Sequence, residues 1–134
     1  MNEHHYRFLR FCVVGTFGFV VDAGTTTLLT QVFWVAVTPA RLLAFLIAAS
    51  VTWALNLRFT FQVGTGSSTW LPYLVASSFG ALINVGMYLL WLGWAGHSAT
   101  QIVAGVAIGS VTALAFNYTI SRRVIFRANR TPPA

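Results

Sequence analysis

The chain has 134 residues, of which 57% are hydrophobic and only 7% are charged. Soluble domains have roughly 25% charged residues, and a soluble fold this small could not bury so much apolar surface. Membrane insertion is the natural interpretation, and it needs runs of about 20 apolar residues. The sequence contains four such runs, so it predicts an all-α membrane protein with four transmembrane helices.

The charge of the chain is almost entirely guanidinium. All eight basic residues are arginines, whereas Glu3 and Asp22 are the only acids. A guanidinium binds phosphate bidentately, so this composition suits an anionic headgroup, although codon bias from a GC-rich genome explains it equally well. The single cysteine, Cys12, excludes an internal disulfide and a cysteine-based metal cluster. We expect neither a metal site nor a cofactor.

The first predicted span covers residues 11–34. One face of it is small and polar because offsets of three, seven and eleven residues return to the same side of a helix. This face consists of Gly15, Gly18, Asp22 and Thr26. Asp22 lies about 18 Å along the helix from Arg10, at mid-membrane, where a carboxylate facing lipid is costly. It is therefore either a proton-coupling or substrate-gating group, or a structural hydrogen-bonding partner of a neighbouring helix.

The second predicted span covers residues 40–61 and begins after Pro39, which suits a first helical turn. Thr52 and Asn56 share a face with a small residue, Ala49, and this face leads towards Arg58. A linker rich in glycine, serine and threonine, residues 62–70, follows.

The third predicted span covers residues 71–94, and Gly80 and Asn84 lie on its small and polar face. Asn84 occupies a depth comparable to that of Asp22, so it either lines a polar path or makes a structural hydrogen bond between helices. The fourth span covers residues 99–120. Its Gly105 and Gly109 form a small-x-x-x-small pair, which serves packing either within the chain or between two copies, and Asn117 continues the same face.

Two related halves are expected within a single domain of residues 1–134, approximately residues 7–61 and 71–126. Each half ends in the pattern Arg-x-x-Phe, with the arginine at position 58 or 123 and the aromatic at 61 or 126. With four spans, both termini and the middle linker lie on one side. Seven arginines would be on that side and only Arg41 on the other. By the positive-inside rule, both termini are predicted to be in the cytoplasm and the protein to be multi-pass in the cytoplasmic (inner) membrane.

Several of these motifs together resemble the GtrA-like family of small four-helix membrane proteins. They are Arg7-Phe8-Leu9-Arg10-Phe11 with Val14-Gly15, Asp22, the Asn-x-Arg-x-Thr-Phe ending at 56–61, and Asn117-Tyr118 with Arg122-Arg123-Val124-Ile125-Phe126. The resemblance implies a role in cell-surface polysaccharide or cell-wall glycan synthesis, most often as a flippase for a polyprenyl-phosphate-linked monosaccharide.

Candidate site residues follow from that resemblance and from the polar faces. The substrate phosphate would bind Arg58, Arg122 and Arg123, although arginines at this end also serve orientation and attract anionic lipids. The sugar would pass along Asp22, Thr52, Asn56, Asn84 and Asn117. The glycines expected to pack helices together are Gly15, Gly18, Gly80, Gly105 and Gly109.

Two other functions stay open at this stage: a membrane anchor that recruits a glycosyltransferase, and a small multidrug-type exporter. An enzyme is not expected, because the sequence contains neither a catalytic nucleophile paired with a general base nor a glycine-rich loop that could bind phosphate. Arginines at membrane borders do not form a nucleic-acid-binding face. The expected partners are a polyprenyl-phosphate-linked sugar, membrane lipids, a membrane glycosyltransferase and further copies of the chain as a homo-oligomer.

Overall fold

The structure, a computed structural model, describes residues 3–63 and 67–127. Its long helices are α1 (Glu3–Gln31), α2 (Val37–Leu55), α3 (Trp70–Ala95) and α4 (Ala99–Ile120), and a short 3-10 helix, η2 (Ser67–Thr69), precedes α3. The described residues contain no strand. The predicted all-α class is confirmed, and four helices are long and apolar enough to cross a membrane. The first helix begins at Glu3, well before the predicted start at residue 11.

The second and fourth helices both end in a π-helical turn, which the sequence analysis did not predict. These turns are η1 (Asn56–Thr60) and η3 (Ser121–Ile125). In each, the N–H of a phenylalanine donates to a carbonyl five residues earlier: Phe61 to Asn56 at 2.9 Å and Phe126 to Ser121 at 3.0 Å. The two bonds are 65 positions apart in the sequence. The widened turn moves each phenylalanine to a different side of its helix from the one a regular α-helix would give.

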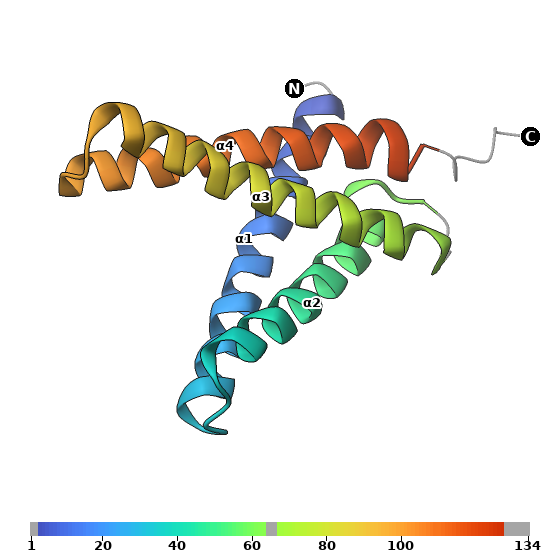
Figure 1. Ribbon diagram of the computed structural model, residues 1–134. Helices are drawn as coiled ribbons and strands as arrows, with labels where there is room; N and C mark the ends of the chain where they lie inside the picture. Colours follow the sequence, from blue (N-terminus) through green and yellow to red (C-terminus); the bar gives the residue numbers. More distant parts are fainter. Residues whose placement is uncertain (1–2, 64–66, 128–134) are drawn as a thin grey trace, which may run out of the picture.

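The four helices form two hairpins, α1 with α2 and α3 with α4, which point in different directions (Figure 1). The hairpins meet near the start of α1 and α3 and the ends of α2 and α4, and their tips lie far apart. Most contacts between helices are made within a hairpin. Beyond their common end, the two hairpins therefore pack little against each other.

Small residues at every fourth position allow close packing within each hairpin. Ala40, Ala44 and Ala48 are buried on α2, and Gly105, Gly109 and Ala113 are buried on α4. The two sets are again related by 65 positions. Without large side chains in between, the backbones approach closely enough for dispersion forces to hold the helices together in lipid.

The two hairpins are joined by a cluster of buried residues at their common end. It consists of Phe11, Leu57, Phe61, Tyr73, Ala76, Ile125 and Phe126. The rings of Phe61 and Phe126 stack with centroids 4.7 Å apart and planes 17° apart. The aromatic residues that close the two π turns thus contact each other directly, and they join the halves of the chain.

Outside this cluster, the long helices expose large apolar side chains. Phe19, Leu82 and Leu90 are each about 70% exposed in the isolated chain. Such a surface would be unstable in water but is the expected one for contact with lipid, where only the backbone and the few polar groups need partners within the protein.

We predict that Gly109→Ala destabilises the fold by about 1–3 kcal/mol, as overpacking does. A methyl group there would collide with the backbone carbonyl and side-chain amide of Asn84, and backbone cannot move aside cheaply. Gly86→Ala is the matched control because no atom lies within 4 Å of the added carbon. It should leave stability unchanged or raise it by up to about 1 kcal/mol, owing to helix propensity. Thermal unfolding of both variants in detergent micelles tests the difference, and equal midpoints would contradict the packing described.

A second prediction concerns the stacked rings. Phe126→Ala should destabilise the protein by about 3 kcal/mol, since Phe126 is 1% exposed and its removal leaves a cavity between the hairpins. Val124→Ala, two residues away at a position 62% exposed, should change stability by less than about 0.5 kcal/mol. The sodium dodecyl sulfate concentration at half-unfolding, followed by circular dichroism, measures both. A small effect at Phe126 would mean that other contacts hold the hairpins together.

Candidate functional site

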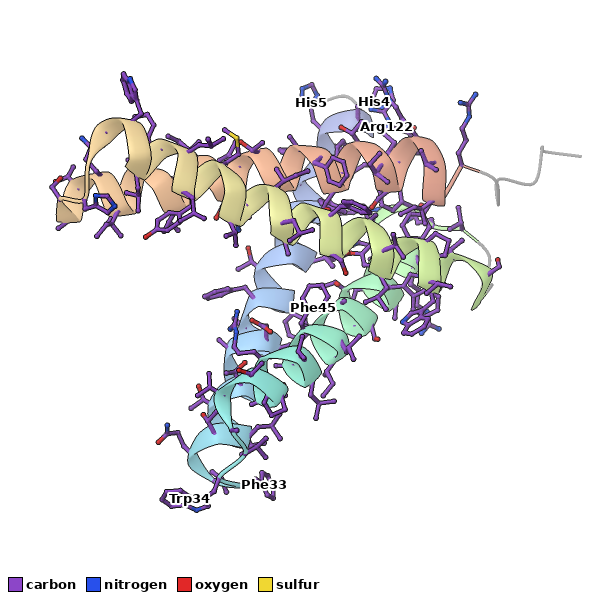
Figure 2. All side chains as sticks on the ribbon, viewed as in Figure 1. His4, His5, Phe33, Trp34, Phe45 and Arg122 are labelled. Carbon is purple, nitrogen blue, oxygen red and sulfur yellow. The ribbon has the colours of Figure 1, made fainter. Side chains whose placement is uncertain are left out.

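A polar cavity lies where the two hairpins diverge, and all four long helices contribute polar side chains to it. These are Asp22 from α1, Thr52 from α2, Ser77 and Asn84 from α3, and Asn117 from α4. The cavity has a volume of about 240 Å³, and the rest of its wall is mainly small or aromatic. Phe45, from α2, is one of these aromatic residues and lies between the hairpins (Figure 2). Four of the five residues predicted for a polar path are therefore brought together.

A second hollow of about 440 Å³ adjoins this cavity and shares Asn84 and Asn117 with it. It adds polar or sulfur-containing side chains from α1 and α4, namely Cys12, Thr16 and Ser110. The polar lining thus continues from the crossing of the hairpins along the groove between α1 and α4.

Glycines position the polar side chains of the cavity. A carbon added at Gly80 would collide with the amide group of Asn117, and one added at Gly109 would collide with Asn84. Between α3 and α4, each helix thus offers a glycine to the asparagine of the other. In the first hairpin, Gly18 faces the methyl group of Thr52 in the same way. The asparagine amides thus occupy space that the side chain of any larger residue at these glycine positions would take.

Asp22 has a partner that the sequence analysis did not identify. Arg41 on α2 donates from Nη1 to Asp22 Oδ2 at 3.2 Å. The sequence predicts only that Arg41 lies on the non-cytoplasmic side, because a contact between its side chain and α1 does not follow from spacing along the chain. A long arginine side chain can extend in this way from an apolar helix to meet a charge.

Three buried polar atoms around the cavity have no hydrogen-bonding partner in the described part of the chain. They are Asp22 Oδ1, Thr26 Oγ1 and Asn117 Oδ1. Each such atom costs roughly 1–3 kcal/mol when its hydrogen bond to water is not replaced. The oxygens of Asp22 and Asn117 are acceptors and belong to residues that line the cavity, whereas Thr26 is not part of its wall. A ligand with hydroxyl groups in the cavity would satisfy the two acceptors.

Asn56 does not belong to the cavity, which corrects the sequence-based placement. It is 1% exposed at the start of η1, where its Nδ2 donates to the Tyr73 hydroxyl at 2.9 Å and its Oδ1 accepts from Thr60 Oγ1 at 2.8 Å. Its amide therefore stabilises the π turn and the contact with α3. Asn56 keeps the helical phase of Thr52, since its N–H still donates to the Thr52 carbonyl, but it lies one turn nearer the joined end, where Tyr73 covers it.

Gly15 also differs from its predicted packing role. It is exposed, and a carbon added there would meet no atom within 4 Å, because Gly15 faces the cavity and the adjoining hollow rather than a neighbouring helix. Gly105 does face another helix, with Tyr88 and Trp91 of α3 at 3.0 and 3.1 Å from an added carbon. Both Gly105 and Gly109 thus pack within the chain.

The predicted phosphate-binding arginines lie at the joined end of the hairpins. Arg58 and Arg123 are exposed, each three residues before one of the stacked phenylalanines. Arg122 donates to His4 Nδ1 at 3.1 Å, and the two side chains lie together near the start of α1 (Figure 2). Arg130, which was counted with the cytoplasmic arginines, lies outside the described residues.

An apolar groove of about 450 Å³ runs along the outside of the same end, between α1 and the end of α2. Apart from Arg10, its lining is hydrophobic or aromatic and consists of Tyr6, Leu9, Val13, Val14, Phe17, Leu55 and Phe59. Arg10 spans the groove, because its Nη1 donates to the Phe59 carbonyl in η1 at 3.1 Å. The sequence analysis did not predict this groove, since its walls come from residues far apart in the chain.

Comparison with known proteins agrees with this architecture. Residues 10–126 match the family model described as the GtrA/DPMS transmembrane domain, and this match covers α1 from residue 10 and the whole of α2, α3 and α4. No solved structure matches the chain. The chain therefore belongs to the GtrA/DPMS transmembrane-domain family, as a multi-pass membrane protein of glycan synthesis.

Proposed function

We propose that the protein moves the headgroup of a polyprenyl-phosphate-linked monosaccharide across the cytoplasmic membrane, for cell-surface polysaccharide or cell-wall glycan synthesis. The observation that supports this most strongly is the polar cavity at the crossing of the hairpins, to which all four long helices contribute polar side chains. Polar groups inside a membrane are costly, so they are retained where something polar must pass or bind.

The chemistry of the cavity suits a sugar. A monosaccharide offers hydroxyl groups that both donate and accept hydrogen bonds, and the cavity presents unpartnered acceptors on Asp22 and Asn117. The asparagine amides and the hydroxyl groups of the cavity wall can form further hydrogen bonds by small side-chain rotations. Because the cavity is open between diverging hairpins, a headgroup could enter sideways while its hydrocarbon chain stays in lipid.

The phosphate would be held by the arginines of the two π turns. Arg58 lies six residues after Thr52, and Arg123 lies six residues after Asn117. Six residues correspond to about 9 Å along a helix, which is close to the length of a sugar and its phosphate linkage. A phosphate at the arginines would therefore leave the sugar within reach of the cavity. The guanidinium group is well suited to this contact because it binds phosphate with two parallel hydrogen bonds.

The apolar groove beside Arg10 could hold the first isoprene units of the lipid. Its hydrophobic walls begin at the end where Arg58 lies, next to Phe59, so a lipid with phosphate at the arginine could extend its chain along the groove. We place both chain termini in the cytoplasm, so that this end of the molecule faces the enzymes that load the lipid.

The ion pair of Asp22 favours this function over a multidrug-type exporter. An exporter of organic cations needs a carboxylate that is available to the cation, whereas Arg41 already neutralises Asp22. The role of a glycosyltransferase anchor would need no polar cavity, yet it stays the alternative against which transport must be tested.

We predict that purified protein in phosphatidylcholine liposomes transfers the headgroup of a short polyprenyl-phosphate monosaccharide between leaflets. The readout is the fraction of sugar accessible to a membrane-impermeant oxidant over time. Arg58→Ala with Arg123→Ala should slow transfer at least about tenfold, because each substitution removes a charged hydrogen bond to the lipid phosphate. Asp22→Asn should also slow it, since it disrupts the ion pair at the cavity.

The matched control is Arg7→Ala with Arg127→Ala, which removes the same charge from the same end of the molecule. This double variant should transfer lipid at the wild-type rate. Equal loss in both double variants would mean that the arginines serve insertion or surface charge. Absence of transfer by folded wild type with several sugars would reject the flippase and favour the glycosyltransferase anchor.

The protein is further proposed to work as a homo-oligomer, because its diverging hairpins leave the cavity open on one side. Gly15 on α1 lines this cavity, and because no atom lies within 4 Å of a carbon added there, another helix could approach it. Stepwise photobleaching of single labelled molecules in vesicles should count two or more subunits per particle. One subunit per particle at native density would contradict this assembly.

A further inference from the structure

We infer that Arg41 is a second phosphate-binding residue at the opposite end of the polar path, and that Asp22 occupies its guanidinium when no phosphate is present. This inference rests on the proposed translocation, in which the arginines proposed to bind phosphate all lie at the other end of the molecule. It assigns to Arg41 and Asp22 a role in receiving and releasing the lipid phosphate.

The positions of the arginines on α2 and its π turn are the first argument. Arg41 precedes Arg58 by 17 residues, which corresponds to about 25 Å along a helix. The hydrocarbon core of a membrane is about 30 Å thick, so one continuous helical segment has a guanidinium near each border. A lipid phosphate leaving Arg58 for the other leaflet would arrive at the depth of Arg41.

The geometry of the ion pair is the second argument. One guanidinium nitrogen of Arg41 contacts one oxygen of Asp22 at 3.2 Å, whereas a tight arginine–carboxylate pair would use two parallel hydrogen bonds. The Arg41 side chain is 59% exposed, so the ion pair does not enclose it. The pair therefore leaves room for a second anion to bind.

The other Asp22 oxygen supplies the third argument. Oδ1 is buried and has no hydrogen-bonding partner in the described residues, although its carboxylate lines the cavity. A pair that served only stability would satisfy this oxygen, because an unpaired buried acceptor is costly. The arrangement instead leaves an acceptor for a sugar hydroxyl beside a guanidinium for a phosphate.

Competition between two anions for one guanidinium explains why the pair would aid transport. An incoming phosphodiester displaces the carboxylate and takes its place at Arg41. When the lipid diffuses away, Asp22 returns to the arginine, so the site is left neutral. Without Asp22, the arginine would hold the phosphate longer, and release would become slower.

The test measures binding separately from transport. The probe is farnesyl phosphate, titrated into the purified full-length protein in phosphatidylcholine nanodiscs and followed by phosphorus-31 NMR. Asp22→Asn should tighten binding about fivefold, the effect of removing a competing exposed ion pair of about 1 kcal/mol. Arg41→Gln should weaken binding, and in Asp22→Asn with Arg41→Gln the gain should be absent.

Glu3→Gln is the matched control, because Glu3 pairs with Arg7 at 3.7 Å on the exposed start of α1. It removes the same charge and should leave the affinity unchanged. Equal affinity of Asp22→Asn and wild type, or a gain that persists without Arg41, would overturn the inference. Thermal unfolding of each variant identifies loss of fold. If the binding pattern holds while wild type shows no lipid transfer, the proposed flippase fails and the phosphate site stands.

Discussion

The stacking of Phe61 on Phe126 is the contact on which the rest of the arrangement depends. Each ring closes a π turn, and the extra residue in that turn brings the ring into the space between the hairpins. Because the hairpins are joined mainly through this buried cluster, they are free to diverge beyond it. The cavity lies at the start of that divergence, so its position follows from where the two π turns meet.

Helix packing within each hairpin differs from packing between the two hairpins. Within each hairpin, small residues allow the backbones to approach, and the polar side chains fit over glycines of the opposite helix. Between the hairpins there is little packing, and acceptor atoms of Asp22 and Asn117 stay unpaired. In lipid there is no water to satisfy them, so this region has a free-energy cost that packing within the hairpins must offset. Such a cost is expected at a site that binds a polar ligand.

The sequence was sufficient for the four helices and for much of the cavity, since apolar length and helical periodicity depend only on local order. Asp22, Thr52, Asn84 and Asn117 were all predicted to line a path, and the structure brings them together. Asn56 was misplaced because Tyr73 of α3 covers it, and spacing along α2 does not reveal a contact with another helix. The ion pair of Asp22 with Arg41 could not be predicted either, because it depends on how α1 lies against α2 rather than on spacing along either helix.

The ion pair itself argues that Asp22 is not retained for stability. A single-contact ion pair whose arginine side chain is 59% exposed contributes at most about 1 kcal/mol, whereas an unpartnered buried oxygen costs about 1–3 kcal/mol. An apolar residue on each helix would pack at least as well in lipid. The net balance is unfavourable for the folded chain alone, and it becomes favourable only when a ligand supplies the donor that Asp22 lacks and the anion that Arg41 can accept.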